Sequence, residues 1–416
     1  MLRSLRPSAA ELHQRWLRSE DLPLMHPDRR LLVVTESLGI GGTESHLIRL
    51  SVPLAEQGWN TTIYCLSESG QRAQQVEAAG IRVCSLPRRR KRRRTSGRSP
   101  ANIALAASRL FRLMREWRPH VVHFYLPGPY LVGAPLAIAA GAPIKIMSRR
   151  SLSIYQQRRP LLARIETLLH RRMDAVIGNS NAVVAELAKE GIPSNKIRLI
   201  YNGIETEPAF PPRAEARRLL GIGPDTVVGI IVANLISYKG HKDLLEGLGR
   251  ISPSLPSGWR ILCVGRDDGL RAKLETLAQA RNIESNVQFL GERIDTPRLL
   301  AAADFGVLSS WEEGFSNVIL EAMSAGLPMV VTDVGGNTEI VSTEETGLVV
   351  PSRDPEALGN AILRLAGDPV LRERLGKAGR ARVKGEFSIE RCVDAHRRLY
   401  EELWARLNQN RTARTP

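Results

Sequence analysis

The stretch that decides the fold is EEGFSNVILEAMSAGLPMVVTDVGGNTEIV, residues 312–341. Gly314 interrupts the segment after the apolar run FGVLSS, and Ser316 or Asn317 can cap the helix VILEAMSAG, which ends at Gly326. PMVVTD then predicts a buried strand, and VGGNTEIV predicts a second glycine-rich turn before a helix, on another wall of the same site. Because a helix N-terminus offers unpaired N–H groups to an anion, the stretch predicts a phosphate-binding loop in an open α/β sheet.

Two carboxylates of this stretch, Glu313 and Glu321, raise the question of a catalytic acid and base. If both sat in one helix, they would lie about 12 Å apart along its axis and be rotated roughly 80° from each other. Carboxyl groups that act together on one glycosidic bond lie about 5–10 Å apart. The helix start between them instead makes Glu313 a loop residue and Glu321 a residue of the first helical turn.

Apolar strands alternate with amphipathic helices from Arg30 onward, in two series. The first series contains LLVVTE, TTIYCLS, IRVCSLP, VVHFYLP, IKIMSR, DAVIGNS and KIRLIYNG. The second contains TVVGIIVAN, WRILCVG, NVQFLG, FGVLSS, PMVVTD and TGLVVP. Repeated β-α-β alternation predicts doubly wound parallel sheets. Because ligands bind beyond the carboxyl ends of such strands, two sheets facing each other would enclose a deep cleft.

The two series meet near IYNGIETEPAFPPRAEA, a stretch rich in proline and glycine as linkers often are. A chain of 416 residues is also too long for one ordinary core. The expected divisions are an N-terminal extension over 1–28, a first Rossmann-like domain over 29–205, a second over 206–385, and a C-terminal helix over 386–416 that packs back towards the first domain.

The formal net charge of +16 favours an anionic partner. Seven of the cations form the run RRRKRRR, which self-repulsion should keep solvated and outside regular structure. This run could be a nucleic-acid tail, a solvated loop without a partner, or a contact with an anionic leaflet, to which each cation contributes about 1 kcal/mol. We favour the membrane contact and expect no nucleic acid, because no nucleic-acid-binding motif accompanies the run. Its residues are Arg88, Arg89, Arg90, Lys91, Arg92, Arg93 and Arg94.

The spacing of the cysteines and the length of the apolar runs indicate the cellular compartment in which the protein works. Cys65, Cys84, Cys263 and Cys392 lie far apart without C-x-x-C spacing, which predicts core residues of a reduced cytosolic protein. No apolar run approaches the roughly 20 residues needed to span a bilayer. We therefore expect a cytoplasmic protein that is at most peripherally bound to the cytoplasmic face of the membrane.

Two further loops carry candidate chemistry. SLGIGGTE, residues 37–44, lies between a strand and a helix and lets the backbone approach a ligand closely. A dinucleotide-binding G-x-G-x-x-G is disfavoured there, because its third glycine position holds Glu44, which would repel a pyrophosphate. In ANLISYKGHKDLLEGL, residues 233–248, Lys239 at the mouth of a parallel sheet is suited to neutralising a diphosphate leaving group. The alternative is a solvated lysine before a helix.

From about residue 30 to 405 the chain resembles glycosyltransferase family four, the retaining sugar-nucleotide transferases of the GT-B fold. The matching text includes GIGGTE, VVH, NSNAVV, IYNGIE, LISYKGHKDLL, CVGRDDG and the E-x7-E segment EGFSNVILEAMSAGLPMVVTDVGGNTE. The resemblance implies two Rossmann-like domains facing across a deep cleft, with a nucleotide-sugar donor as substrate and no cofactor or metal.

The resemblance also implies roles for individual residues. Lys239 would stabilise the departing diphosphate, Glu313 would contact the donor sugar hydroxyls, and Glu321 would hydrogen-bond the ribose. Glu44 and Tyr125 are expected on the acceptor side. Further donor-binding positions are Gly41, Gly42, Asn234, Gly265, Phe315, Ser316, Asn317 and Val318.

Two departures from the family pattern leave questions open. The family commonly has an arginine five residues before the lysine, where this chain has Asn234, which cannot supply a bidentate cation. Lys239 or another basic residue would then carry more of the leaving-group charge. The family also often shows H-x-H where this chain has HFY, so either His123 takes the catalytic histidine's role or Tyr125 has replaced it. A core histidine is the alternative for His123, whereas His46 and His241 are expected to be structural.

We therefore expect a retaining, metal-independent glycosyltransferase of the hexosyltransferase type. It would move a sugar from a nucleotide donor, UDP in our interpretation, to a glycan or lipid-linked acceptor in polysaccharide or glycolipid synthesis. The alternatives are a UDP-sugar epimerase of the same fold and a non-catalytic sugar-nucleotide-binding protein. The sequence does not identify the sugar, the acceptor or the linkage.

Overall fold

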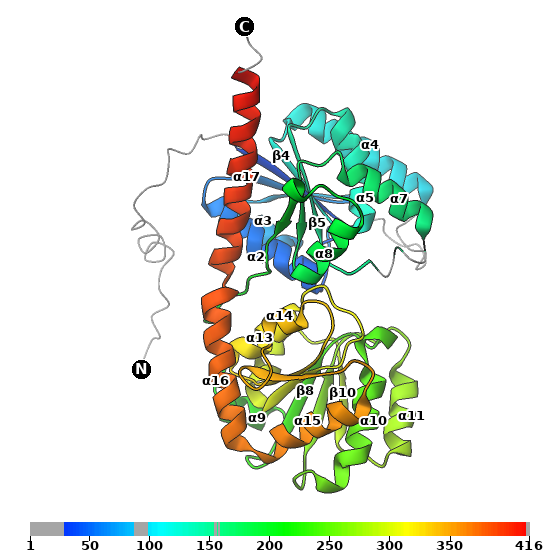
Figure 1. Ribbon diagram of the computed structural model, residues 1–416, viewed down its shortest axis with the longest axis vertical. Helices are drawn as coiled ribbons and strands as arrows, with labels where there is room; N and C mark the ends of the chain where they lie inside the picture. The colour runs from blue at the N-terminus through cyan, green and yellow to red at the C-terminus, as the bar shows by residue number, and fades with distance from the viewer. Residues whose placement is uncertain (1–28, 87–98, 154–155, 157–158, 413–416) are drawn as a thin grey trace, which may run out of the picture.

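The first strand, β1 (Arg30–Thr35), organises the amino-terminal sheet and is buried on both faces. Leu31 and Val33 belong to one apolar cluster and Leu32 and Val34 to another, so alternate residues pack on opposite sides. This is the pattern of a parallel sheet covered by helices on both faces. The computed structural model, which describes residues 29–86, 99–153, 156 and 159–412, shows two such sheets (Figure 1).

Seven parallel strands form the amino-terminal sheet, in the order β3-β2-β1-β4-β5-β6-β7. After β1, the strands are β2 (Asn60–Cys65), β3 (Arg82–Cys84), β4 (Val121–Tyr125), β5 (Ile144–Arg149), β6 (Ala175–Gly178) and β7 (Ile197–Leu199). The helices of this domain are α2 (Gly42–Glu56), α3 (Ala73–Ala78), α4 (Pro100–Trp117), α5 (Pro127–Ala139), α7 (Pro160–His170) and α8 (Asn181–Lys189), with the short 3₁₀ turn η1 (Ser194–Lys196).

Six parallel strands form the second sheet, in the order β10-β9-β8-β11-β12-β13. They are β8 (Val228–Val232), β9 (Arg260–Val264), β10 (Val287–Gly291), β11 (Phe305–Leu308), β12 (Met329–Thr332) and β13 (Gly347–Val350). Around them lie α9 (Arg213–Leu219), η2 (Ser237–Lys239), α10 (His241–Ile251), η3 (Ser252–Ser254), α11 (Arg271–Ala280), α12 (Thr296–Ala302), α13 (Asn317–Ser324), α14 (Asn337–Ile340), α15 (Pro355–Gly367) and α16 (Pro369–Glu386). The predicted pair of doubly wound parallel sheets is confirmed.

Both sheets reverse their strand order at one point, between β1 and β4 in the first and between β8 and β11 in the second. Loops that leave the carboxyl ends of strands at such a switch point diverge and leave a crevice between them. The loops after β1, β8 and β11 carry the three motifs singled out in the sequence, so the fold brings these motifs to the crevices.

The chain passes between the domains twice, and the two crossings pack together. Ile204 accepts a hydrogen bond from Ile389 and donates one to Phe387. Beyond this point α17 (Ile389–Thr412) runs back along the amino-terminal domain, where Figure 1 shows it as the long helix beside α2. Its Tyr400 is fully buried, with its ring 5.3 Å from that of Trp59.

Other predictions from the sequence have mixed outcomes. The extension over 1–28 and the basic run 88–94 lie outside the described residues. All four cysteines are free; Cys65, Cys263 and Cys392 are buried as predicted, whereas Cys84 is only partly buried. No helix within the described ranges is both long and apolar enough to cross a membrane.

Candidate active site

A cavity of about 490 Å³ lies between the two domains. The amino-terminal domain contributes the turn after β1, the residues after β5 and Asn202, while the second domain contributes the ends of β8 and β9 and the loop before α13. Of the residues predicted as site residues, the cavity is lined by Gly41, Gly42, Asn234, Lys239, Gly265, Glu313, Phe315, Ser316, Asn317, Val318 and Glu321. Three motifs far apart in the sequence therefore share one cavity.

Lys239 and Glu313, which both line this cavity, form an ion pair. Their Nζ and Oε1 atoms are 2.5 Å apart, and the two side chains are only 19% and 11% exposed. Ser310 donates a hydrogen bond of 2.8 Å to the same carboxylate oxygen. Burial alone would lower the pKa of Lys239, but the charge of Glu313 and the hydrogen bond to it outweigh burial and raise that pKa. The lysine is therefore a cation at neutral pH.

The backbone around Lys239 is fixed by close contact with the loop of Glu313. Gly240 has a φ of 70°, and a Cβ there would lie 1.8 Å from the carbonyl oxygen of Ser309, so no other residue fits without displacing the loop. On the other side, the Trp311 amide donates to the Tyr238 carbonyl at 2.7 Å, and its indole donates to Asp243 at 2.6 Å. These contacts hold the ammonium and the carboxylate in one geometry.

The first turn of α13 begins at the cavity. Ser316 is the N-cap residue, and its side chain makes no capping hydrogen bond. Asn317 instead contacts the opposite domain: its Nδ2 donates to the Gly42 carbonyl at 2.9 Å, and its Oδ1 accepts from Asn202 at 2.7 Å. The helix N-terminus thus faces the glycine turn after β1, as an anion-binding site between the two domains requires.

Glu321, one turn further along α13, is bound by a residue that sequence reasoning missed. Arg49 of α2 donates to its Oε1 at 2.8 Å, and both side chains are about a quarter exposed, at 23% and 27%. This ion pair bridges the domains beside the cavity. No local motif marks Arg49, because its partner lies 272 positions away in the sequence.

The second glycine-rich turn, VGGNTEIV, contacts the other domain rather than the cavity. Glu339 accepts hydrogen bonds from the backbone amides of Asn181 and Ala182, at 2.9 and 3.2 Å, and from the Tyr201 hydroxyl at 2.9 Å. A carboxylate at the first turn of α8 is favourable because the helix dipole is positive there. The sequence predicted that this turn would form a second wall of the site, but none of its residues lines the cavity.

Three residues predicted for the catalytic or acceptor side do not line the cavity. His123 and Tyr125 are fully buried in β4. The ring nitrogens of His123 are 2.7 Å from the Tyr400 hydroxyl and 2.8 Å from that of Ser148, and burial lowers its pKa, with smaller contributions from His396 and Arg150. Glu44 is partly buried in the first turn of α2, beside Gly41.

The reason for this difference is the direction of the side chains on β4. The prediction assumed that a residue near the carboxyl end of a parallel strand faces the ligand. Alternate residues of a strand face opposite sides of the sheet, and His123 and Tyr125 face the side covered by α2 and α17. The position of His123 therefore does not support its assignment as a catalytic residue.

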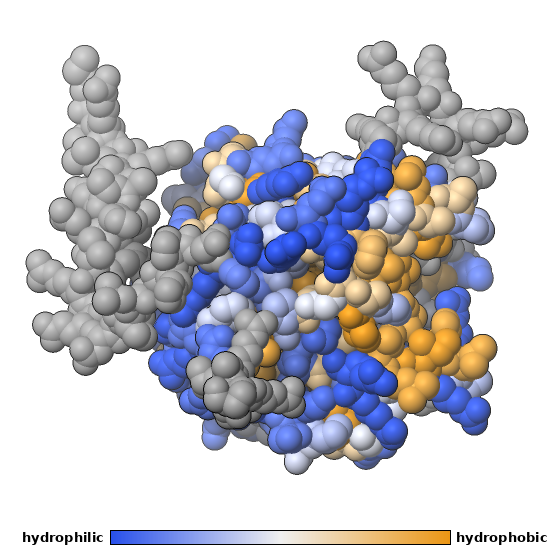
Figure 2. Space-filling model, turned by 90° about the horizontal axis from the view of Figure 1, so that it is seen from above, coloured by the Kyte–Doolittle hydropathy of each residue, from blue (hydrophilic) through white to orange (hydrophobic). Residues whose placement is uncertain are grey.

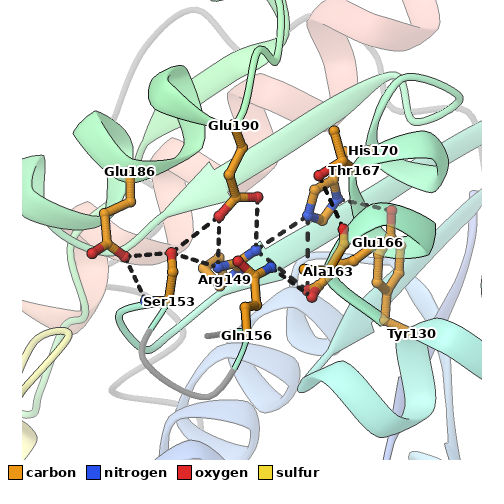
Figure 3. Close-up of polar contacts among 10 residues, drawn as sticks. All are labelled: Tyr130, Arg149, Ser153, Gln156, Ala163, Glu166, Thr167, His170, Glu186 and Glu190. Atoms are coloured by element: carbon orange, nitrogen blue, oxygen red, sulfur yellow. Dashed lines mark hydrogen bonds and ion pairs between the residues drawn. The ribbon is translucent and has the colours of Figure 1, made fainter. Parts of the chain in front are cut away.

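The residues after β5 line the cavity beside Gly314 and are anchored by a buried network (Figure 3). Arg149, whose side chain is 1% exposed, makes ion pairs with Glu190 at 3.1 Å and with Glu166 at 3.4 Å. Ser153 donates both its amide and its hydroxyl to Glu186 at 2.6 Å. Since the network holds both ends of the segment 149–153, the residues between them have a fixed position at the cavity.

Two family models match most of the described chain. The model described as Glycosyltransferase Family 4 matches residues 40–208, and the model described as Glycosyl transferases group 1 matches residues 226–368. The lipopolysaccharide core biosynthesis mannosyltransferase LpsB of Rhizobium meliloti is 32% identical over 246 residues, which are 56% of this chain and 67% of that protein. An Escherichia coli enzyme named UDP-Gal:alpha-D-GlcNAc-diphosphoundecaprenol alpha-1,3-galactosyltransferase is 25% identical over 307 residues, covering 71% of this chain and 78% of that protein.

Solved structures share the fold. HepE of Anabaena, in complex with UDP and glucose, superposes with a TM-score of 0.79 at 21% identity, over 90% of this chain and 100% of that one. Sucrose-phosphate synthase of Thermosynechococcus elongatus gives a TM-score of 0.75 at 24% identity, over 91% and 100%. The architecture is therefore that of the GT-B glycosyltransferases, as the motifs predicted.

Proposed function

The chain belongs to the family 4, group 1 glycosyltransferases, and from this premise we propose that it transfers a sugar from a UDP-linked donor to a glycan or lipid-linked acceptor with retention of configuration. The observation that carries the proposal is that the Lys239–Glu313 ion pair and the N-terminus of α13 line one cavity between the two domains. An ammonium and a helix N-terminus in one cavity suit a diphosphate leaving group.

Lys239 and Glu313 exchange each other for groups of the donor when the donor binds. On donor binding, the diphosphate takes the ammonium of Lys239, and Glu313 turns its carboxylate to hydroxyls of the sugar. The backbone N–H groups of Phe315 to Val318 bind the phosphates, and Glu321 receives the ribose. The turn at Gly41 and Gly42 closes over the phosphates from the other domain.

In the transfer step, the bond between the anomeric carbon and the diphosphate oxygen breaks as the acceptor oxygen bonds to the same face of that carbon. The proton of the acceptor hydroxyl passes to the departing phosphate oxygen. Positive charge from Lys239 and the helix N-terminus stabilises the leaving group, so the proposed chemistry needs no metal ion.

We propose a lipid-linked acceptor because of the outer surface of the amino-terminal domain, and because the Escherichia coli relative is named for a diphosphoundecaprenol substrate. Figure 2 shows an apolar patch on this domain. The exposed apolar side chains of its outer helices are Ile103 and Leu105 of α4, Ile138 of α5, and Leu161, Ile165 and Leu168 of α7. Five residues separate the basic run from Pro100, the first residue of α4, so cations and apolar side chains adjoin in sequence.

This surface would hold the enzyme on the cytoplasmic face of an anionic membrane. Replacing residues 88–94 by Gly and Ser should weaken binding to vesicles that contain anionic lipid. Leu161→Ser with Leu168→Ser should weaken binding to both anionic and neutral vesicles, because those two side chains are 70% and 61% exposed. If both variants bind vesicles as tightly as the native chain does, the proposed membrane contact is wrong.

The test of the transferase itself is incubation with UDP-sugars and a lipid-diphosphate acceptor. We expect transfer by the native chain, with Lys239→Ala folded but inactive. UDP release with an epimerised sugar in the absence of acceptor would indicate an epimerase, and binding without turnover would indicate a non-catalytic protein. Near-normal turnover by Lys239→Ala would refute the role of the lysine.

A further inference from the structure

Three cationic side chains line the donor cavity, and two of them are already paired with carboxylates. Lys239 pairs with Glu313 at 2.5 Å, and Arg293 makes two contacts of 2.8 Å with Asp295. The third, Arg150, donates one hydrogen bond of 2.5 Å to the neutral amide oxygen of Asn202. No carboxylate of the described residues lies within ion-pair distance of it. Its charge is therefore available to a ligand.

Arg150 has a fixed position because its neighbours on both sides are anchored. It directly follows Arg149, whose guanidinium is held by Glu166 and Glu190 in the buried network of Figure 3. Its own backbone presses on the loop of Glu313, since a Cβ on Gly314 would lie 2.4 Å from the Arg150 carbonyl oxygen. A side chain that starts from so constrained a backbone is preorganised for binding.

The hydrogen bonds of Arg150 lead to the helix terminus where a phosphate would bind. Asn202 accepts from the guanidinium and donates to Asn317, the first residue of α13, at 2.7 Å. One amide side chain therefore separates the guanidinium from the first turn of α13. Arg150 is partly buried, its guanidinium lies 5.9 Å from the centre of the Tyr125 ring, and burial lowers its pKa. An anion at that point would supply the negative charge that its neutral neighbours lack.

The second domain does not supply an equivalent charge. Asn234, at the end of β8, is neutral, and its Oδ1 accepts a hydrogen bond from the backbone amide of Arg266. The charge of Lys239 is matched by Glu313 until a ligand displaces it. A diphosphate carries at least two negative charges, so the second domain alone leaves it under-neutralised.

We infer that Arg150 is a phosphate-binding residue, which the amino-terminal domain contributes across the cleft to the diphosphate of the nucleotide-sugar donor. This inference rests on the proposed function and names a residue of the same site. Since the helix N-terminus and Arg150 belong to different domains, a diphosphate bound by both also holds the domains together. The affinity of the donor and the closure of the cleft are then linked.

The test compares binding of UDP and of uridine, by calorimetry, to the native chain and to Arg150→Gln. Glutamine keeps a donor for Asn202 but removes the charge, so a loss of binding reports the charge and not the hydrogen-bond chain. We expect UDP affinity to fall roughly 10- to 100-fold, as for loss of one charge-assisted contact, with uridine affinity unchanged. Arg271→Gln is the control, because Arg271 is an arginine of the second domain that is paired with Glu275 and does not line the cavity. Its UDP affinity should change less than threefold.

The same variants separate donor phosphate from acceptor phosphate and test the folding of the site. Arg150→Lys should recover part of the UDP affinity, and all variants should melt within a few degrees of the native chain. If Arg150→Gln binds UDP as tightly as the native chain, the inference is wrong. A rise in the KM for a lipid-diphosphate acceptor, with UDP affinity unchanged, would assign Arg150 to the acceptor and also overturn it. If the native chain itself binds no UDP, the proposed function fails first.

Discussion

Substitution of Gly314 by alanine should separate closure of the cleft from folding of the domains. Gly314 lies in the second domain, and the atoms nearest to its missing Cβ belong to Arg150 and Ser151 of the first, at 2.4 Å from the Arg150 carbonyl oxygen and 3.1 Å from the Ser151 Cα. The added methyl group therefore collides only when the domains are together. Within the second domain alone the alanine should be tolerated.

The size of the effect follows from the nature of the contact. These neighbours are backbone atoms anchored by the buried Arg149 network, so they cannot yield as the end of a flexible side chain would. Overpacking of this kind costs about 1–3 kcal/mol. Because only the closed arrangement bears this cost, the ratio of closed to open protein should fall roughly 5- to 150-fold.

The assay measures the distance between spin labels on α4 and α11, together with the dissociation constant for UDP. In Gly314→Ala we expect a longer and broader distance distribution without ligand, and weaker UDP binding, while the melting temperature of the second domain is retained. Gly367→Ala is the control, because a Cβ at Gly367 would meet no atom within 4 Å. If the two variants show the same interdomain distance and the same UDP affinity, the contact seen here does not control closure.

Three further predictions concern stability and chemistry. Arg149→Ala should lower the free energy of unfolding, measured with urea, by about 3–5 kcal/mol, because Glu166 and Glu190 lose their buried partner. Replacing both glutamates by Gln in the same variant should recover much of this loss. Burial lowers the pKa of His170 to about 3 and that of His396 to about 4. Below about pH 6.5 the unfolded chain therefore binds protons at these histidines that the folded chain does not bind. The free energy of unfolding should fall as the pH drops from 6.5 to 4, and a flat profile would contradict this. Sugar transfer should persist in excess EDTA, whereas loss of turnover that Mg²⁺ or Mn²⁺ restores would refute the metal-independent mechanism.

The sequence predicts this fold because its signals are local. Glycine turns, cap residues and β-branched runs each act within about ten residues, and they place Lys239, Glu313 and the start of α13 at strand ends, where the structure has them. Which face of the sheet a side chain lies on is harder to predict from sequence when both faces of its strand are buried. His123 illustrates this, since VVHFY is buried at every position and carries no alternation from which to choose a face.

Contacts between the domains could not be predicted in this way. Arg49 binds Glu321, and Asn202 binds Asn317, across 272 and 115 positions of sequence. The motif that contains Asn317 and Glu321 gives no sign of their partners in the other domain. The pair Arg149–Arg150 at the end of an apolar strand was the one local signal available, because two adjacent cations at the carboxyl end of a buried strand must find anionic partners. One finds them in the buried network, and the other faces the cavity.

In the proposed mechanism, the charges in the cleft explain why the two glutamates of EEGFSNVILEAM can lie in a site for a polyanion. Glu313 holds Lys239, and Glu321 holds Arg49, so each carboxylate is neutralised by a cation before the donor arrives. Binding then exchanges partners: phosphate takes the ammonium, and hydroxyls of the sugar and ribose take the carboxylates. At Lys239 this exchange replaces one charge pair by another, so it should add little to the salt dependence of donor affinity. Arg150, which has no carboxylate to release, should supply most of that dependence, and the slope of log Kd for UDP against log salt concentration should flatten in Arg150→Gln more than in Lys239→Gln.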